Sequence, residues 1–158
     1  MPNVHTCIWF DNQAEEAALF YTALVPDSQI GSILRNPGGA PGSEVGDVIQ
    51  ADFTLAGQRY VALNGGPMFP LTEAVSIVLT CETQAEADRY WEALTADGGA
   101  ESMCGWCKDR FGLSWQIVPQ ACIDLVSDPD PEVSRRAVES MMTMQRLDSE
   151  VMARAARP

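Results

Sequence analysis

The chain contains an internal repeat, and a repeat constrains the fold more than any single motif does. Residues 7–24, CIWFDNQAEEAALFYTAL, match residues 77–94, IVLTCETQAEADRYWEAL, at an offset of 70 positions. Glu16 aligns with Glu86, and an aromatic pair in the first stretch meets an aromatic pair in the second. Each stretch has the pattern of an apolar strand, a polar turn and a helix. The sequence therefore predicts two copies of one structural module.

Both predicted helices have one apolar face. Apolar residues recur at helical spacing, as Ala17, Phe20, Tyr21 and Leu24 in the first helix and Ala87, Tyr90, Trp91 and Leu94 in the second. Asn12 and Thr83 are the expected helix caps, and Glu15 and Glu86 three residues later complete the capping-box spacing. Each helix is therefore expected to pack on one face of a sheet.

Three strands are predicted after each helix, at Ser28–Leu34, Val48–Leu55 and Gln58–Asn64, and at Gly99–Cys104, Gly105–Lys108 and Leu113–Pro119. Ala56-Gly57 and Phe111-Gly112 are the expected turns. Helices do not alternate regularly with strands, which disfavours a doubly wound parallel sheet. We predict an α+β fold of two tandem βαβββ modules with mixed sheets, at 1–66 and 67–126, plus C-terminal helices at 127–158.

The connecting segments carry no nucleotide motif. Asn36–Gly46, NPGGAPGSEVG, lacks both the P-loop and the dinucleotide fingerprint, so we interpret it as a flexible loop or lid. The tail begins after Ser127–Pro131, a stop-and-restart signal. Apolar residues mark one face of a first helix at Val133, Ala137, Met141 and Met144, and continue into a second helix at Leu147, Val151 and Met152. This face is expected to pack on its own core or on a sister subunit.

Charge limits the classes of partner. Ten Lys and Arg against 22 Asp and Glu give a net charge of −12, which argues against binding nucleic acid or an anionic membrane surface. No apolar run approaches the ~20 residues of a membrane helix, and the N-terminus has no basic region of a secretory signal. The five cysteines, an odd number, are expected to be reduced thiols of a cytoplasmic protein.

Several strings resemble one known family. They are CIWFDNQAEEAALFYTALVPDSQIG, GQRYVALNGGP, TEAVSIVLTCETQAEADRYWEAL and CGWCKDRFGLSWQIVP. Together they are similar to the PhnB-like branch of the vicinal-oxygen-chelate superfamily, the glyoxalase/bleomycin-resistance/dioxygenase fold, over roughly residues 4–148. The resemblance implies a homodimer in which each concave sheet face closes around a small-molecule cavity.

This branch is often labelled a 3-demethylubiquinone-9 3-methyltransferase domain. Methyl transfer from S-adenosylmethionine normally needs a glycine-rich turn between a parallel strand and a helix. The glycines at 38, 39 and 42 lie instead between strands predicted to be antiparallel. We therefore regard the label as a family name and disfavour methyl transfer.

The resemblance also implies positions for metal ligands on the cavity strands. They fall on Thr6, Ser76, Gln116, and Ala62 or Val61, none of which is a histidine or a carboxylate. Neutral oxygens alone bind a transition metal poorly, so no cofactor is predicted and a divalent metal is disfavoured. His5, the single histidine, lies one residue from an expected position and is the one candidate metal ligand.

Cys104 and Cys107 form a CxxC motif. A thioredoxin-like motif opens a helix, and a structural zinc site needs two further ligands. Here the motif is predicted in a strand or turn and the other cysteines lack paired spacing, so neither use is favoured.

Strand alternation predicts a cavity lining. The lining consists of Thr6, Ile8, Phe10, Tyr60, Asn64, Ser76, Trp106, Lys108 and Gln116. Such a neutral, mixed wall suits a small oxygenated molecule bound without a metal. Two alternatives remain open, a metal-dependent lyase, isomerase or dioxygenase, and a drug-sequestering resistance protein. Catalytic residues, and whether the protein is an enzyme, stay undetermined.

Overall fold

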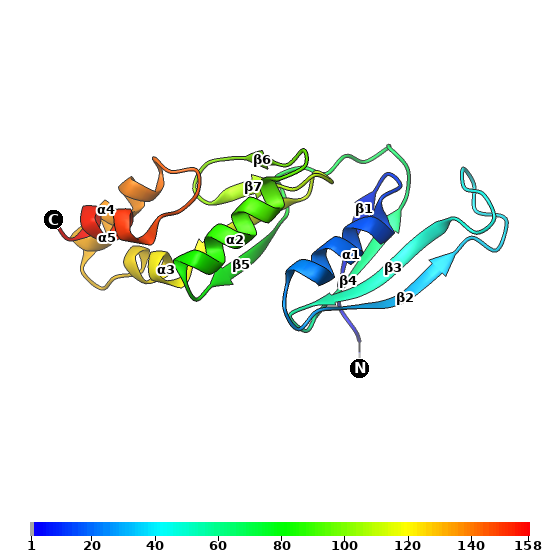
Figure 1. Ribbon diagram of the computed structural model, residues 1–158, viewed down its shortest axis with the longest axis horizontal. Helices are drawn as coiled ribbons and strands as arrows, with labels where there is room; N and C mark the ends of the chain where they lie inside the picture. The colour runs from blue at the N-terminus through cyan, green and yellow to red at the C-terminus, as the bar shows by residue number, and fades with distance from the viewer. Residues whose placement is uncertain (1) are drawn as a thin grey trace. The chain divides into compact units, whose positions relative to one another are not determined.

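The computed structural model describes residues 2–158 and divides into two compact units. The first unit ends at Leu71, and the second spans Thr72–Pro158. Each contains a four-stranded sheet with one helix against it (Figure 1). The predicted α+β fold of two βαβββ modules with mixed sheets and C-terminal helices is confirmed. Within residues 2–158, no helix is both long and apolar enough to span a membrane.

The first unit contains β1 (Thr6–Phe10), α1 (Ala14–Leu24), β2 (Gln29–Arg35), β3 (Val48–Leu55) and β4 (Gln58–Asn64). The strand order is β1-β4-β3-β2, with β1 parallel to β4 and the other pairs antiparallel. Ala56 and Gly57 join β3 to β4 with φ angles of 45° and 81°. Two positive φ angles in succession are the geometry of a tight hairpin turn, as the sequence predicted.

The second unit repeats this plan with β5 (Ser76–Cys81), α2 (Gln84–Thr95), β6 (Ala100–Glu101), β7 (Trp106–Lys108) and β8 (Ser114–Pro119). Its strand order, β5-β8-β7-β6, is equivalent to that of the first sheet. The strand predicted at Gly99–Cys104 ends at Glu101, because Cys104 has a φ of 59° and turns the chain away from the sheet.

Each helix packs over one face of its own sheet. Tyr21 of α1 is fully buried, and its ring centroid lies 6.1 Å from that of Phe53 on β3. In the second unit Trp91 of α2 and Trp115 of β8 are both buried. We call the face of each sheet that lies opposite α1 or α2 the open face.

The two helix caps differ. Thr83 caps α2 as predicted, since its Oγ1 accepts a hydrogen bond of 3.1 Å from Glu86 N. The prediction that Asn12 caps α1 is wrong, because the capping position is Gln13, whose side chain makes no capping bond. Ala14 N instead donates to Asn64 Oδ1 of β4, at 2.8 Å. A strand residue thus replaces the local cap.

The tail folds into α3 (Gln120–Val126), α4 (Pro131–Met141) and α5 (Ser149–Ala156) within the second unit. Its core consists of Cys122, Leu125, Val133, Ala137, Leu147, Met152 and Ala156, with Met141 and Met144 packed against it. The predicted face is confirmed except at Val151, which is 38% exposed.

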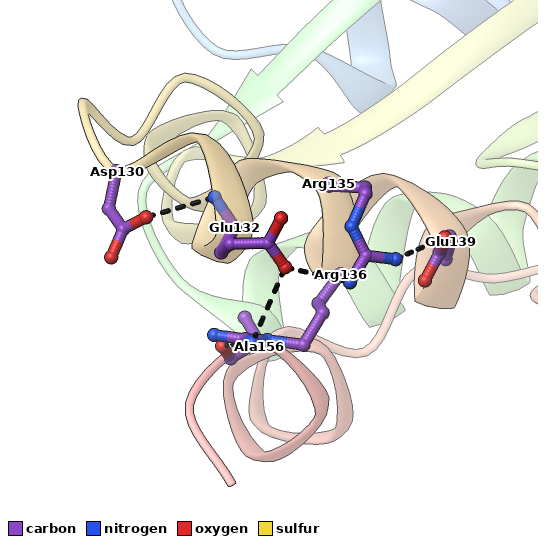
Figure 2. Close-up of polar contacts among 6 residues, drawn as sticks. All are labelled: Asp130, Glu132, Arg135, Arg136, Glu139 and Ala156. Carbon is purple, nitrogen blue, oxygen red and sulfur yellow. Dashed lines mark hydrogen bonds and ion pairs between the residues drawn. The ribbon is translucent and has the colours of Figure 1, made fainter.

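Polar contacts fix α4 (Figure 2). Asp130 caps the helix by accepting from Glu132 N at 2.9 Å, and Arg135 forms an ion pair with Glu139 one turn away. Arg136 Nε donates to the carbonyl of Ala156 at 2.9 Å, which joins α4 to α5. Exposed pairs contribute little singly, so burial of the apolar faces dominates the stability of the tail.

Candidate functional site

A cavity of about 520 Å³ lies in the second unit, and we call it the second-unit pocket. It is lined by Glu73, Ala100, Glu101, Ser102, Met103, Cys104, Trp106, Cys107, Lys108 and Ser114. The antiparallel register pairs Lys108 of β7 directly with Ser114 of β8. Trp106 precedes Lys108 by two residues and therefore points to the same face. Two of the predicted lining residues, Trp106 and Lys108, thus come together here.

Ser114 is the most unusual group in the pocket. Its side chain is 1% exposed, yet its Oγ has no hydrogen-bond partner among the residues that the structure describes. A buried hydroxyl without a partner costs about 1–3 kcal/mol relative to one that is satisfied. A buried hydroxyl without a partner requires an explanation, and a ligand in the adjacent cavity would supply the missing partner.

Lys108 supplies positive charge at the pocket. Its Nζ lies 2.5 Å from Glu73 Oε1, and 35% of the lysine side chain is exposed. The hydrogen bond from Lys108 lowers the pKa of Glu73 below its usual range, which favours its charged form. Because Glu73 is 65% exposed, a ligand carboxylate can take its place at little cost in desolvation.

Ser76 and Gln116 lie on the same open face. Gln116 Nε2 donates to Ser76 Oγ at 2.9 Å, and Gln116 is paired in register with Trp106. The two residues bond to each other beside the pocket and do not line it. As ligand contacts they stay predictions.

The first-unit residues predicted to line a cavity lie on the helix-covered face. Ile8 and Phe10 are 6% and 2% exposed. The Tyr60 ring stacks on Phe53, with centroids 5.3 Å apart, beneath α1. Asn64 caps α1, whereas Thr6, at the start of β1, is exposed. Ile8, Phe10 and Tyr60 thus contribute to the core, and Asn64 both caps α1 and lines a cavity of the first unit. As ligand contacts the first-unit residues stay predictions.

A single additional residue explains the difference. Three residues separate β1 from α1, but only two separate β5 from α2. The helices therefore repeat at 70 positions and the preceding strands at 71, so Ser76 corresponds to His5 and not to Thr6. A shift of one residue moves every strand side chain to the other face.

The corrected register places His5 on the open face of the first unit. Asp52, on the same face, accepts hydrogen bonds from Ser32 at 2.5 Å and Gln50 at 2.9 Å. The Ser32 bond is the largest cause of a lowered Asp52 pKa, with smaller contributions from the charges of Arg59 and His5. His5 thus lies close enough to Asp52 to interact electrostatically.

The donor set does not fit the metal that the fold family implies. With the corrected register, the positions implied by the family are His5 and Val61 in the first unit and Ser76 and Gln116 in the second, so a single imidazole is the one strong metal ligand among these four residues. Within residues 2–158, no group of three or more His, Cys, Asp or Glu side chains is placed to hold a metal. We derive no chemistry through a metal, and His5 as a ligand stays a prediction.

The glycine-rich loop borders another cavity, of about 680 Å³, in the first unit. Asn36, 2% exposed, organises this loop, since its Oδ1 accepts from Gly38 N at 2.8 Å and its Nδ2 donates to the carbonyl of Ser43 at 3.0 Å. The cavity lining has no lysine, arginine or aromatic side chain. The second-unit pocket offers more for recognition, so it is our candidate site.

The predicted lining does not include the other residues of the pocket wall, which are Glu73, Ala100, Glu101, Ser102, Met103, Cys104, Cys107 and Ser114. Glu73 precedes β5 and has no place in the strand pattern. Met103 and Cys104 fall in a predicted strand, whereas they lie in the turn before β7. Alternation along strands cannot position residues that reach a site from turns.

The cysteines differ in burial and therefore in expected reactivity. All five are free thiols, and Cys81, Cys107 and Cys122 are buried, which raises their pKa values to about 11, about 12 and about 11. Near pH 8, we expect dithiodipyridine to modify the exposed Cys7 and the half-buried Cys104 in the native protein, and all five thiols after unfolding in guanidinium. A third thiol reacting at the same rate in the native protein would contradict this assignment.

Known proteins share this architecture. Residues 2–118 match the model of a family described as 3-demethylubiquinone-9 3-methyltransferase. No functionally curated protein matches the chain. A putative 3-demethylubiquinone-9 3-methyltransferase, PhnB protein, from Bacillus cereus is 36% identical, with a TM-score of 0.67, over 75% of this chain and 99% of that one.

Another solved structure, protein PA1353 from Pseudomonas aeruginosa, is 21% identical, with a TM-score of 0.62, over 75% of this chain and 98% of the other. A fosfomycin resistance protein, FosX, from Listeria monocytogenes is 14% identical, with a TM-score of 0.48, over 73% of this chain and 89% of its own. At 21% identity the likeness to PA1353 concerns the fold alone.

Proposed function

The chain belongs to the PhnB-like family, described as 3-demethylubiquinone-9 3-methyltransferase, of the vicinal-oxygen-chelate superfamily, and from this premise we propose that it binds a small oxygenated molecule in the second-unit pocket without a metal. The single observation that carries the proposal is Ser114, a buried hydroxyl that has no partner among the described residues and lines the cavity beside Lys108. Trp106 adds an apolar ring surface to the same wall.

These groups favour a ligand with two parts. The Lys108 ammonium attracts a carboxylate or a similar anionic oxygen group, and the Ser114 hydroxyl can donate a hydrogen bond to it. The Trp106 ring suits an apolar or aromatic body. Methyl transfer is disfavoured for this chain, because the glycine-rich loop joins two antiparallel strands and not a strand to a helix.

Benzoate is a simple probe with both parts, and acetate and benzyl alcohol each carry one. We expect benzoate to raise the midpoint of thermal unfolding more than either partial probe, and to do so equally in EDTA. Isothermal titration gives the affinity. Equal responses to the three compounds would contradict the proposed two-part recognition, and loss of the benzoate response in EDTA would favour the metal-dependent alternative.

Replacing Lys108 with methionine should weaken benzoate binding about tenfold, because the ammonium is lost while the length of the side chain is kept. Glu73→Gln should strengthen binding, because the competing carboxylate no longer occupies Lys108. Lys108 and Glu73 therefore change the affinity in opposite directions, which a general loss of structure cannot do. Unchanged affinity in both variants would contradict the role of the ion pair.

Ser114→Ala separates binding from stability. Removing an unsatisfied hydroxyl should raise the free energy of unfolding by about 1 kcal/mol, while benzoate affinity falls, because the ligand loses a partner. Urea unfolding and titration measure the two quantities. A variant that is both less stable and unchanged in affinity would show that the hydroxyl has a structural role only.

We also propose a homodimer and a cytoplasmic location. Val78, on the open face of β5, is 53% exposed, and a large exposed apolar side chain on a sheet face supports its burial by another copy of the chain. Five free thiols support a reducing compartment. Light scattering after size exclusion tests the dimer, and a monomeric mass at micromolar concentration would contradict it.

A further inference from the structure

The segment between α4 and α5, Met142–Asp148, lies outside the part of the chain that the family shares. The resemblance read from the sequence extends to about residue 148, but the family model ends at residue 118, and the Bacillus cereus PhnB structure aligns over 99% of its own length but only 75% of this chain. We call this segment the α4–α5 linker. It is therefore an addition to the common two-module domain.

The linker bonds directly to the turn that forms one wall of the second-unit pocket. Cys104 N donates to the carbonyl of Met144, and Gly105 N donates to the carbonyl of Gln145, both at 2.7 Å. Met103, Cys104 and Trp106, on either side of these bonds, line the pocket. Two short backbone hydrogen bonds thus join the linker to the pocket wall.

The turn needs this support because its backbone is strained. Cys104 has a φ of 59°, a left-handed conformation that costs a residue with a side chain about 1–2 kcal/mol. Gly105 has a φ of 81°, and a Cβ there would lie 3.0 Å from the carbonyl oxygen of Ile117 and 3.1 Å from Leu147 Cδ1. Leu147 of the linker therefore packs against the turn as closely as a glycine permits.

The other side of the linker is held by α2. Gln84 Nε2 donates to the carbonyl of Leu147 at 2.8 Å, and Gln84 Oε1 accepts from Ser149 N at 2.9 Å. Arg146 also forms an ion pair with Asp88 of α2, at 3.5 Å. The linker is thus clamped between the first turns of α2 and the pocket wall, and Gln84 itself does not line the pocket.

We propose that the α4–α5 linker is a positioning element of the ligand site, held by Gln84, which fixes the Cys104–Gly105 turn and through it the Trp106 wall. This inference rests on the proposed function, because it concerns the affinity of the same pocket. It assigns to the additional C-terminal helices a role in setting which ligands this chain accepts. Met142 extends the effect to the rim, since its Sδ lies 3.5 Å from Cys104 Sγ.

The test uses the full chain with the substitution Cys7→Ser. Among the cysteines that the structure describes, Cys104 is then the one that is not buried. Gln84→Ala should raise the rate of Cys104 modification by dithiodipyridine about fivefold, because the turn opens more often. Benzoate affinity should fall about fivefold in the same variant. The modification rate reports on the turn without any ligand, so it does not depend on the proposed function.

Gln120→Ala is the matched control. Gln120 and Gln84 both donate from Nε2 to an aspartate four residues later on their helices, at 2.8 Å and 3.0 Å. Gln84 alone of the two also bonds to Leu147 and Ser149. We expect Gln120→Ala to leave the Cys104 rate and the affinity at the values of the parent. Equal changes in both variants would overturn the proposal.

The remaining outcomes are also distinct. An unchanged Cys104 rate in Gln84→Ala overturns the positioning role. A raised rate in a protein whose parent binds no benzoate supports linker control of the turn but contradicts the proposed function. If Gln84→Ala unfolds at the assay temperature, Gln84→Glu provides the test, since it keeps the acceptor for Ser149 N and removes the donor to Leu147. A Cys104 rate equal to that of the parent in this variant would overturn the proposal.

Discussion

Replacing Asp109 with asparagine should lower the free energy of unfolding by about 2–3 kcal/mol. Asp109 is 2% exposed and lies in the turn between β7 and β8. Its Oδ1 accepts from Phe111 N at 2.9 Å and Leu113 N at 3.1 Å, and its Oδ2 accepts from Trp115 Nε1 at 2.8 Å. An asparagine that keeps the first two bonds must turn its NH₂ group toward the indole N–H. Two buried donors then face each other without an acceptor.

The effect should extend to the pocket. Asp109 follows Lys108 directly, and Ser114 begins the strand on the other side of the turn. The hairpin that Asp109 closes therefore sets the pairing of the two residues that we expect to contact the ligand. Benzoate affinity should fall together with stability, in contrast to Ser114→Ala, in which the two quantities move in opposite directions.

Asp97→Asn is the control for this prediction. Asp97 lies in the same unit, its side chain is 78% exposed, and its ion pair with Arg110 spans 3.8 Å. Exposed pairs of this length contribute little, so the variant should unfold within about 0.5 kcal/mol of the parent. Urea titrations followed by tryptophan fluorescence measure both variants. Coincident unfolding curves for Asp109→Asn and Asp97→Asn would refute the buried acceptor role.

The fold could be predicted because two modules carry the same pattern. Helical spacing identifies the face of α1 that buries Tyr21 and the face of α2 that buries Trp91, and both lie against their sheets. The strands β3 and β4 have the bounds that the sequence predicts, since a tight turn at Ala56-Gly57 separates two regular apolar patterns. Because each element of the module occurs twice, the prediction for one copy can be checked against the pattern of the other.

The site was less predictable, because its residues depend on strand register and on turns. The offset of 70 positions that aligns the helices is wrong by one residue for the strands before them. Applied to the first strand, it places Thr6 on the open face, although His5 lies there. The extra residue lies in the turn before α1, where the helix is capped by Asn64 from a distant strand. A local sequence signal cannot reveal a cap that comes from β4.

Gly99→Ala should lower the free energy of unfolding by about 4 kcal/mol or more, a larger loss than that expected for Asp109→Asn. A Cβ at this position would lie 2.3 Å from the Leu94 carbonyl oxygen, 2.7 Å from Thr95 Cα and 2.8 Å from the Lys108 carbonyl oxygen. All three are backbone atoms, so no rotation of a side chain can relieve the overlap. Either the end of α2 must move or β6 must separate from β7, and both changes displace the strand that carries Lys108.

Gly98→Ala distinguishes this overlap from the general cost of losing a glycine. Gly98 is the preceding residue, has a φ of 106° and would place its Cβ in open space. Its replacement should cost only the backbone strain of a positive φ, about 1–3 kcal/mol, and should leave Cys104 reactivity and benzoate affinity near the parent values. In Gly99→Ala both should change, because the pocket wall moves with β6. Equal stability losses in the two variants would show that β6 separates from β7 at little cost. That result would contradict the role of this strand pair in holding the pocket wall.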